Sequence, residues 1–244
     1  VLARFVARQR EGGAYLSVLG FGRGNLDDAT MQALAQNGNG TAAYIDTLQE
    51  AQKVLVDQLA GALFPIADDV KVQVEFNPAE VAEYRLIGYE TRALRREDFS
   101  NDRVDAGEIG AGHQVTALYE ITPPGSPALR NDPLRYGAVT AAEGAPGELG
   151  FLRLRAKAPG AADSVLTEVP IPAEPARADS ETAFAAAIAG FGQLLRGGVY
   201  LGDWGYAEAI ALAEDARGPD RFGYRAEAVR LMRLAESLAA AENR

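Results

Sequence analysis

The spacing of apolar residues changes twice along the 244-residue chain and divides it into three parts. Residues 1–63 alternate helical spacing with short apolar runs, residues 64–175 follow a period of two, and residues 176–244 return to helical spacing. The pattern predicts an α+β protein. We expect an incomplete, Rossmann-like α/β piece, then an antiparallel β-sandwich-like domain, then a helical segment packed on the β domain.

The first part alternates helices and strands, which is typical of a parallel sheet with helical crossovers. The predicted elements are a helix before Gly12, a strand at 15–21, a helix capped by Asp27 or Asp28, a strand at 41–45, and a helix from Thr47 to Pro65 with its apolar stripe beginning at Leu48 and passing Leu55. Two strands are too few to bury such apolar faces. We expect cover from a missing N-terminal part, from the following domain or from a second copy of the chain.

The second part contains five predicted strands separated by turn residues. They span 70–76, 84–91, 114–122, 149–157 and 165–171. In the first of them the alternation places Val70, Val72 and Val74 toward the core and Lys71 toward solvent. Residues 105–112 contain three glycines and are predicted to be a loop that enters the third strand. The stretches 123–147 and 158–163 are predicted to be long connections.

Three helices are predicted in the last part. Asp179 or Ser180 caps the first and Gly197-Gly198 ends it, Asp203 caps the second, and the third runs over residues 224–241. The residues of the third helix with inward spacing are Ala228, Leu231, Met232, Ala235 and Leu238.

Composition excludes several classes of function. The net charge of -10 and the pI of about 4.7 argue against a nucleic-acid partner. The chain has no cysteine and a single histidine, His113, so a zinc cluster or a Ser-His-Asp relay is poorly supported and we expect no enzyme. No transmembrane segment of about 20 apolar residues is present. Because the chain begins at Val1 without a signal peptide, we expect a fragment whose beginning has been removed.

One acidic run offers candidate metal ligands. Asp98, Asp102, Asp105 and Glu108 are oxygen donors of the kind that Ca²⁺ prefers, although their spacing matches no EF-hand loop. A solvated loop is the alternative interpretation.

The other candidate sites have structural interpretations that are stronger than the functional ones. The glycine-rich turn at 20–25 lacks a phosphate-loop pattern and is interpreted as a tight strand-to-helix turn. His113 is interpreted as a structural or surface residue, and Trp204 as a packing residue rather than a ligand anchor.

Several sequence segments, spread over almost the whole chain, resemble one protein family. Residues 16–22, 24–25, 35–40 and 44–46 resemble the last third of a von Willebrand factor type A domain from a bacterial envelope protein. The phrases at 72–78, 84–90, 105–120, 134–136 and 189–192 resemble the C-terminal domain of unknown function that follows the A domain in those proteins.

This resemblance implies an adhesion site for a divalent metal, Mg²⁺ or Ca²⁺, built from an Asp-x-Ser-x-Ser loop. Its ligands are expected upstream of Val1, so no metal ligand and no cofactor are assigned within this chain. The resemblance also implies a cell-envelope location, periplasmic or lipoprotein-anchored. The leading hypothesis is therefore a non-enzymatic module that binds a protein partner. The alternative is a β-sandwich that binds a small ligand or carbohydrate, either with or without calcium.

Overall fold

The computed structural model describes residues 2–22, 24, 27–58, 61, 64–88, 93–132 and 147–242. Contacts group the chain into two compact units, each built from separated segments. One unit comprises residues 1–75, 94–114 and 150–171, and the other comprises residues 76–93, 115–149 and 172–244. The α+β class is confirmed, since helices accompany antiparallel strand pairs. The three-part division at 63 and 175 follows the type of secondary structure rather than contacts, and stays a prediction.

The first unit begins with an α/β segment. Its elements are α1 (Leu2–Glu11), β1 (Val18–Phe21), α2 (Asp28–Asn37), β2 (Ala42–Ile45) and α3 (Leu48–Gln52). β1 and β2 pair in parallel, with Val18 opposite Ala42, as the apolar runs predict. Asp27 caps α2 by accepting the N–H of Thr30 at 3.1 Å. Each predicted strand and cap of this segment therefore has a counterpart in the structure.

The predicted long helix after Thr47 differs from the prediction. α3 ends at Gln52 and continues as a π-helical turn, Lys53–Asp57. The wider i→i+5 turn breaks the 3.6-residue period, so an apolar stripe does not stay on one face. Leu48, predicted to be inward, is 85% exposed. Residues 59, 60, 62 and 63 of the predicted helix lie outside the described residues.

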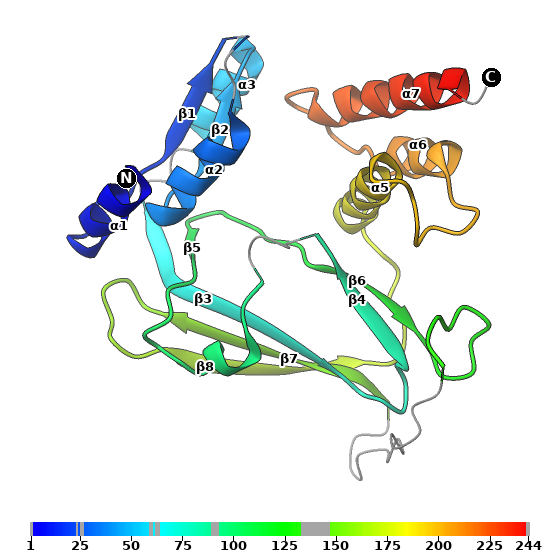
Figure 1. Cartoon of the computed structure of the whole chain (residues 1–244), viewed down its shortest axis with the longest axis horizontal. Coiled ribbons are helices and arrows are strands. Elements are labelled where there is room, and N and C mark those ends of the chain that lie inside the picture. Colours follow the sequence, from blue (N-terminus) through cyan, green and yellow to red (C-terminus); the bar gives the residue numbers. More distant parts are fainter. Residues whose placement is uncertain are drawn as a thin grey trace. The chain divides into compact units, whose positions relative to one another are not determined.

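A four-stranded sheet forms the rest of the first unit, in the order β5–β3–β7–β8 (Figure 1). The strands are β3 (Pro65–Phe76), β5 (Gly107–Gly110), β7 (Glu148–Lys157) and β8 (Val165–Pro172). β7 and β8 agree with the predicted ranges. β5 differs from the prediction, because it lies within residues 105–112, which are predicted to be a loop. It pairs antiparallel with the beginning of β3, and that pairing is invisible to local sequence pattern.

β3 does not follow the predicted alternation of faces. Its register against β5 shifts between Pro65 and Ala67 and again between Ala67 and Val70. Farther along the strand, Lys71 is buried with 3% exposure whereas Val72 is 53% exposed, so the predicted faces of these two residues are wrong. The burial of Lys71 is accommodated by its ammonium, which donates a hydrogen bond to the carbonyl oxygen of Asn101 at 2.5 Å.

The second unit contains a separate antiparallel pair, β4 (Glu83–Ile87) and β6 (Leu118–Thr122), in which Arg85 lies opposite Glu120. β6 begins four residues after the predicted start at 114. The predicted end of β4, residues 89–91, lies outside the described residues. The rings of Tyr84 and Tyr119 both contact Phe76, with centroids 4.8 and 5.3 Å away. Packing of the strands as a sandwich stays a prediction.

Three helices complete the second unit (Figure 1). They are α5 (Ser180–Leu195), α6 (Tyr206–Asp215) and α7 (Tyr224–Glu242). Asp179 caps α5 as predicted, accepting the N–H of Thr182 at 2.7 Å. The predicted Asp203 cap of α6 is wrong. The helix begins after Gly205, whose N–H donates a hydrogen bond to the carboxylate of Glu208 at 2.8 Å. The capping side chain is therefore that of Glu208, which lies inside the helix.

The helices enclose a small, alanine-rich core. Its buried residues are Ala187, Ala209, Ala213, Val229 and Met232, with Trp204 packed against them. The backbone of α5 approaches the Trp204 ring at Gly190, where a Cβ would lie 2.2 Å from the ring, so glycine is required for this contact. Trp204 therefore has the packing role expected from the sequence.

The predicted inward stripe of α7 is correct at Met232, while Ala228 and Ala235 are half-buried and the two leucines of the stripe are exposed. Met232 is fully buried and Val229 is 6% exposed, whereas Leu231 and Leu238, predicted to be inward, are 52% and 58% exposed. Residues 229 and 232 lie three apart on one face, and the contacts with α5 and α6 cover that face. No helix among those described combines the length and apolar character that a membrane span requires.

Candidate functional site

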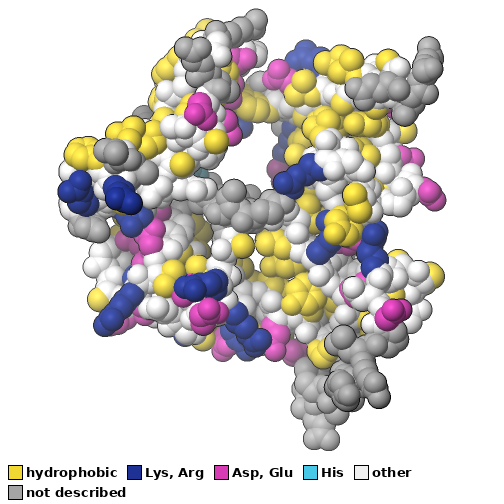
Figure 2. All heavy atoms as spheres, in the orientation of Figure 1, with side chains coloured by type: hydrophobic (Ala, Val, Ile, Leu, Met, Phe, Trp, Pro, Cys, Tyr) yellow, Lys and Arg dark blue, Asp and Glu magenta, His cyan; other side chains and the backbone are white. Residues whose placement is uncertain are grey.

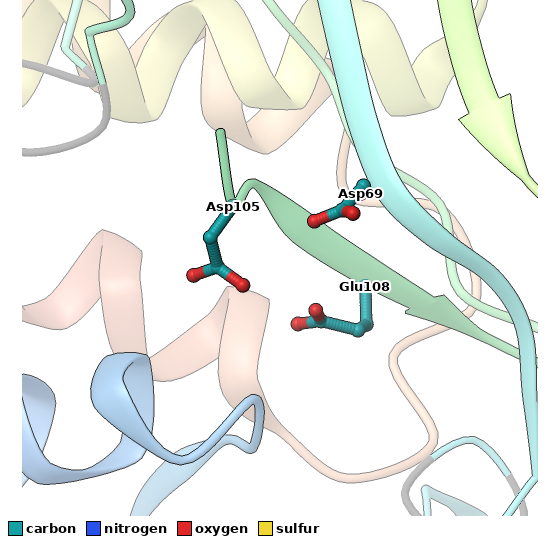
Figure 3. A group of neighbouring side chains, drawn as sticks. All are labelled: Asp69, Asp105 and Glu108. Carbon is teal, nitrogen blue, oxygen red and sulfur yellow. The ribbon is translucent and has the colours of Figure 1, made fainter. Parts of the chain in front are cut away.

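Three carboxylates meet at the edge of the four-stranded sheet. Asp69 belongs to β3, Asp105 to the loop before β5, and Glu108 to β5 itself. One carboxylate oxygen of each lies within 4.8 Å of the others. Figure 3 shows the three side chains directed toward a common space. Among the described residues, this is the group of acidic side chains whose oxygens are close enough to share a cation.

Asp69 owes its position to a bulge in β3. The register irregularity between Ala67 and Val70 gives its backbone a positive φ of 50°, which aspartate tolerates better than most residues. Its carboxylate accepts the N–H of Ala106 at 3.0 Å, and Oδ2 forms an ion pair with Nζ of Lys157 at 2.6 Å. Both side chains of the pair are largely buried, with 18% and 11% exposure. The bulge therefore fixes one corner of the cluster.

Asp105 forms the more exposed corner. Its Oδ2 pairs with Nη1 of Arg10 from α1 at 2.7 Å, and its side chain is 46% exposed. Partial burial raises the pKa of Asp105, and the Arg10 guanidinium opposes that rise. The helix α1 thus supplies one of the two cations of the site.

Glu108 is the carboxylate without a cation of its own. Its Oε1 is buried and accepts no hydrogen bond from any residue that the structure describes. Burial, followed by the negative charge of Asp105, raises the pKa of Glu108 from 4.5 to about 7. At neutral pH this side chain is therefore divided between its protonated and ionised forms.

The charges of the cluster do not balance when all three acids are ionised. Lys157 and Arg10 compensate Asp69 and Asp105, which leaves the charge of Glu108 in excess. A proton on Glu108 removes that charge, and so does a bound cation with a preference for oxygen ligands. The site is therefore able to exchange protons near neutral pH and to accept a hard divalent cation.

The structure separates the four calcium candidates of the sequence. Asp105 and Glu108 lie in the cluster. Asp98 instead pairs with Arg95 at 2.9 Å, and Asp102 accepts hydrogen bonds from Ser164, from Oγ at 2.6 Å and from N at 3.2 Å. Asp69 was missed because it lies 36 residues from Asp105 and belongs to a different strand. Only the pairing of β3 with β5 brings it there.

The remaining candidates of the sequence lie elsewhere. His113 is exposed, and its Nδ1 accepts the N–H of Gly110 at 3.3 Å, so it bonds to the backbone at the end of β5. The glycine-rich turn at 20–25 includes residues 23 and 25, which lie outside the described part of the chain.

Comparison with known proteins identifies relatives whose function is itself uncharacterised. A family model described as "Uncharacterized protein YfbK, C-terminal" matches residues 61–238. The chain is 45% identical to "Uncharacterized protein YfbK" of Escherichia coli (strain K12) over 235 residues. The matched region covers 96% of this chain and 41% of the E. coli protein. No solved structure matches the chain. The chain therefore belongs to the family of the C-terminal part of YfbK.

Proposed function

We propose that the chain is a non-enzymatic, protein-binding module of a bacterial cell-envelope protein, with its α/β segment belonging to a von Willebrand factor type A domain. The order helix, strand, helix, strand, helix over residues 2–52 suits the end of such a domain. The chain spans 41% of the length of its E. coli relative, so the longer protein has sequence that this chain does not include.

Uncovered apolar side chains on the α/β segment carry this proposal. Leu2 is 58% exposed, Phe21 67%, Leu48 85% and Val56 64%. Figure 2 shows hydrophobic side chains on the surface of this segment. Parallel strands are normally buried on both faces, and a two-stranded sheet has little stability alone. Such a surface is expected to be covered by protein in the functional state.

Hydrogen exchange tests this proposal directly. In the 244-residue chain alone, the amides of residues 2–57 should exchange much faster than those of α5–α7, because few apolar contacts hold the segment together. Fusing the upstream part of the E. coli relative to Val1 should slow exchange in residues 2–57 and leave α5–α7 unchanged. Equal protection of both regions in the chain alone, together with a clean monomer in light scattering, contradicts the proposal. Hydrolytic activity lost on His113→Ala also contradicts it.

The carboxylate cluster favours a second candidate, calcium-dependent binding of a small ligand or carbohydrate. Ca²⁺ binding must displace the proton of Glu108, so affinity for Ca²⁺ should rise between pH 6 and pH 8. Calorimetry with CaCl₂ should then show binding that Asp105→Ala abolishes. Asp102→Ala is the matched control, because its carboxylate bonds to Ser164 outside the cluster. Absence of binding at millimolar Ca²⁺ at pH 8 rejects this candidate.

A further inference from the structure

Two arginines of the second unit converge on one tyrosine ring. The guanidinium carbon of Arg85 lies 4.1 Å from the centroid of the Tyr200 ring, and that of Arg130 lies 4.8 Å from it. Tyr200 follows α5 and is 46% exposed, so the ring that gathers both cations is accessible to solvent. Each cation is attracted to the ring face, but the two repel each other.

The charge of Arg85 is already compensated. Arg85 forms an ion pair with Glu120, the residue opposite it in the β4–β6 pair, and its Nη2 donates a hydrogen bond to Oε1 of Gln193 in α5 at 2.5 Å. Its side chain is 26% exposed. Arg85 therefore connects the strand pair to α5 and contacts the Tyr200 ring.

Arg130 is held differently. The carboxylate of Glu83 accepts the backbone N–H groups of Arg130 and Asn131, at 3.1 and 2.8 Å, together with the side-chain amide of Asn131. These bonds fix the loop, and the Arg130 guanidinium extends to the carbonyl oxygen of Val199 at 3.4 Å. It forms no ion pair with any carboxylate that the structure describes. The loop thus presents, beside an exposed ring, a guanidinium that is in no ion pair with a described residue, while the Glu83 carboxylate binds the backbone of the same loop.

The surface around that cation is partly apolar. Val199 is 72% exposed and Tyr200 46%, and Arg130 contacts both. We call Arg85, Arg130, Val199 and Tyr200 the Arg130–Tyr200 surface. Tyrosine and arginine are enriched among the residues that dominate binding energy in protein interfaces, and an aromatic ring with an apolar neighbour offers area for contact.

We propose that the Arg130–Tyr200 surface binds a carboxylate side chain of an acidic protein segment that also carries apolar residues. The proposal rests on the protein-binding function above and names a surface and a partner chemistry for it. A guanidinium fork matches a carboxylate with two parallel hydrogen bonds. The Arg130 guanidinium offers such a fork, because its described contacts are the carbonyl oxygen of Val199 and the ring of Tyr200 rather than a carboxylate. A dianionic phosphate would leave negative charge next to Glu83 and Glu120.

A purely structural role of the stack makes different predictions. If Arg130 only fastened its loop to Tyr200, Arg130→Gln would lower the stability of the protein, and the wild type would not bind the peptide. Because the loop is held by Glu83 through backbone N–H groups, we expect Arg130→Gln to leave the unfolding midpoint unchanged. Arg85→Gln is expected to destabilise, because it leaves Glu120 and Gln193 without their partner.

The test uses ¹⁵N-labelled chain and three blocked pentapeptides, Gly-Leu-X-Leu-Gly, in which X is glutamate, glutamine or phosphoserine. Titration with the glutamate peptide should shift the Nε–H signal of Arg130 and the amide signals around Tyr200, and the shifts should weaken with salt. Arg130→Gln should reduce the affinity at least about tenfold. Arg230→Gln, which changes an exposed arginine on α7, is the matched control and should bind as the wild type.

Four outcomes overturn the proposal. They are equal binding of the glutamine peptide, unchanged affinity in Arg130→Gln, tighter binding of the phosphoserine peptide through Arg130, and binding of phosphatidylserine vesicles through Arg130 in the absence of peptide binding. None of them changes the hydrogen exchange of residues 2–57, so failure here is distinguishable from failure of the proposed function. Conversely, if fusing the upstream part of the E. coli relative to Val1 left hydrogen exchange in residues 2–57 unaltered, the proposed function would fail, whereas peptide binding through Arg130 would persist.

Discussion

Replacing Asp69 by asparagine is expected to lower the free energy of unfolding by about 2–4 kcal/mol at pH 7, because it removes one partner of a largely buried ion pair. Lys157 is 11% exposed and would keep only the carbonyl oxygen of Asp102, at 2.7 Å, as its partner. Asparagine tolerates the positive φ of position 69, so the change reports on charge rather than on backbone strain. Relief of repulsion on Glu108 opposes the loss, but the direct contact at 2.6 Å outweighs it.

Asp105→Asn is the matched control within the same cluster. Its partner Arg10 and its own side chain are 21% and 46% exposed, and ion pairs at such exposure contribute about 0–1 kcal/mol. Urea unfolding followed by circular dichroism should therefore rank Asp69→Asn well below Asp105→Asn in stability. Equal losses in the two variants would show that Lys157 does not depend on Asp69 and would contradict the described geometry.

Glu108→Gln is expected to stabilise the protein at pH 8 and to have a much smaller effect at pH 5. Folding raises the pKa of Glu108 from 4.5 to about 7, so between these values the folded state holds a proton that the unfolded state has released. The free energy of unfolding therefore falls as pH rises through this window. The penalty is absent below pH 4.5 and constant above about pH 7.

The expected difference between pH 5 and pH 8 is about 1–2 kcal/mol, after the full value of about 1.4 kcal/mol per pKa unit is reduced for partial exposure. Urea unfolding of wild type and Glu108→Gln at both pH values measures it. Glu97→Gln changes a glutamate that is 69% exposed and should track the wild type at both. A constant difference between wild type and Glu108→Gln across this range would mean that Glu108 is not desolvated by folding.

Local pattern was sufficient for elements that are defined by their own residues. The caps at Asp27 and Asp179, the parallel strands β1 and β2, and the ranges of β7 and β8 all follow from side-chain chemistry within a few residues. The same reasoning failed where an element depends on a distant one. β5 is a strand because β3 pairs with it, and α7 buries Val229 rather than Leu231 because of the face that α5 and α6 cover.

The candidate site was half predictable for the same reason. Asp105 and Glu108 belong to an acidic run of the sequence, so the sequence included them among four candidates. Asp98 and Asp102 belong to the same run, yet their partners are Arg95 and Ser164. Local sequence cannot separate these residues, because it assigns the same solvated loop environment to each of the four carboxylates. Their orientation is set by the neighbours that folding provides.

By itself, the sequence determined the α+β class and the two-stranded parallel start, and it supplied the resemblance on which the proposed protein-binding function rests. Only the tertiary structure decided that a bulge at Asp69 completes the carboxylate cluster and that Arg85 and Arg130 share the ring of Tyr200. The physical reason is the range of the interactions. Hydrophobic period and capping act within a few residues, whereas ion pairing, desolvation and cation–ring contact depend on distances in space.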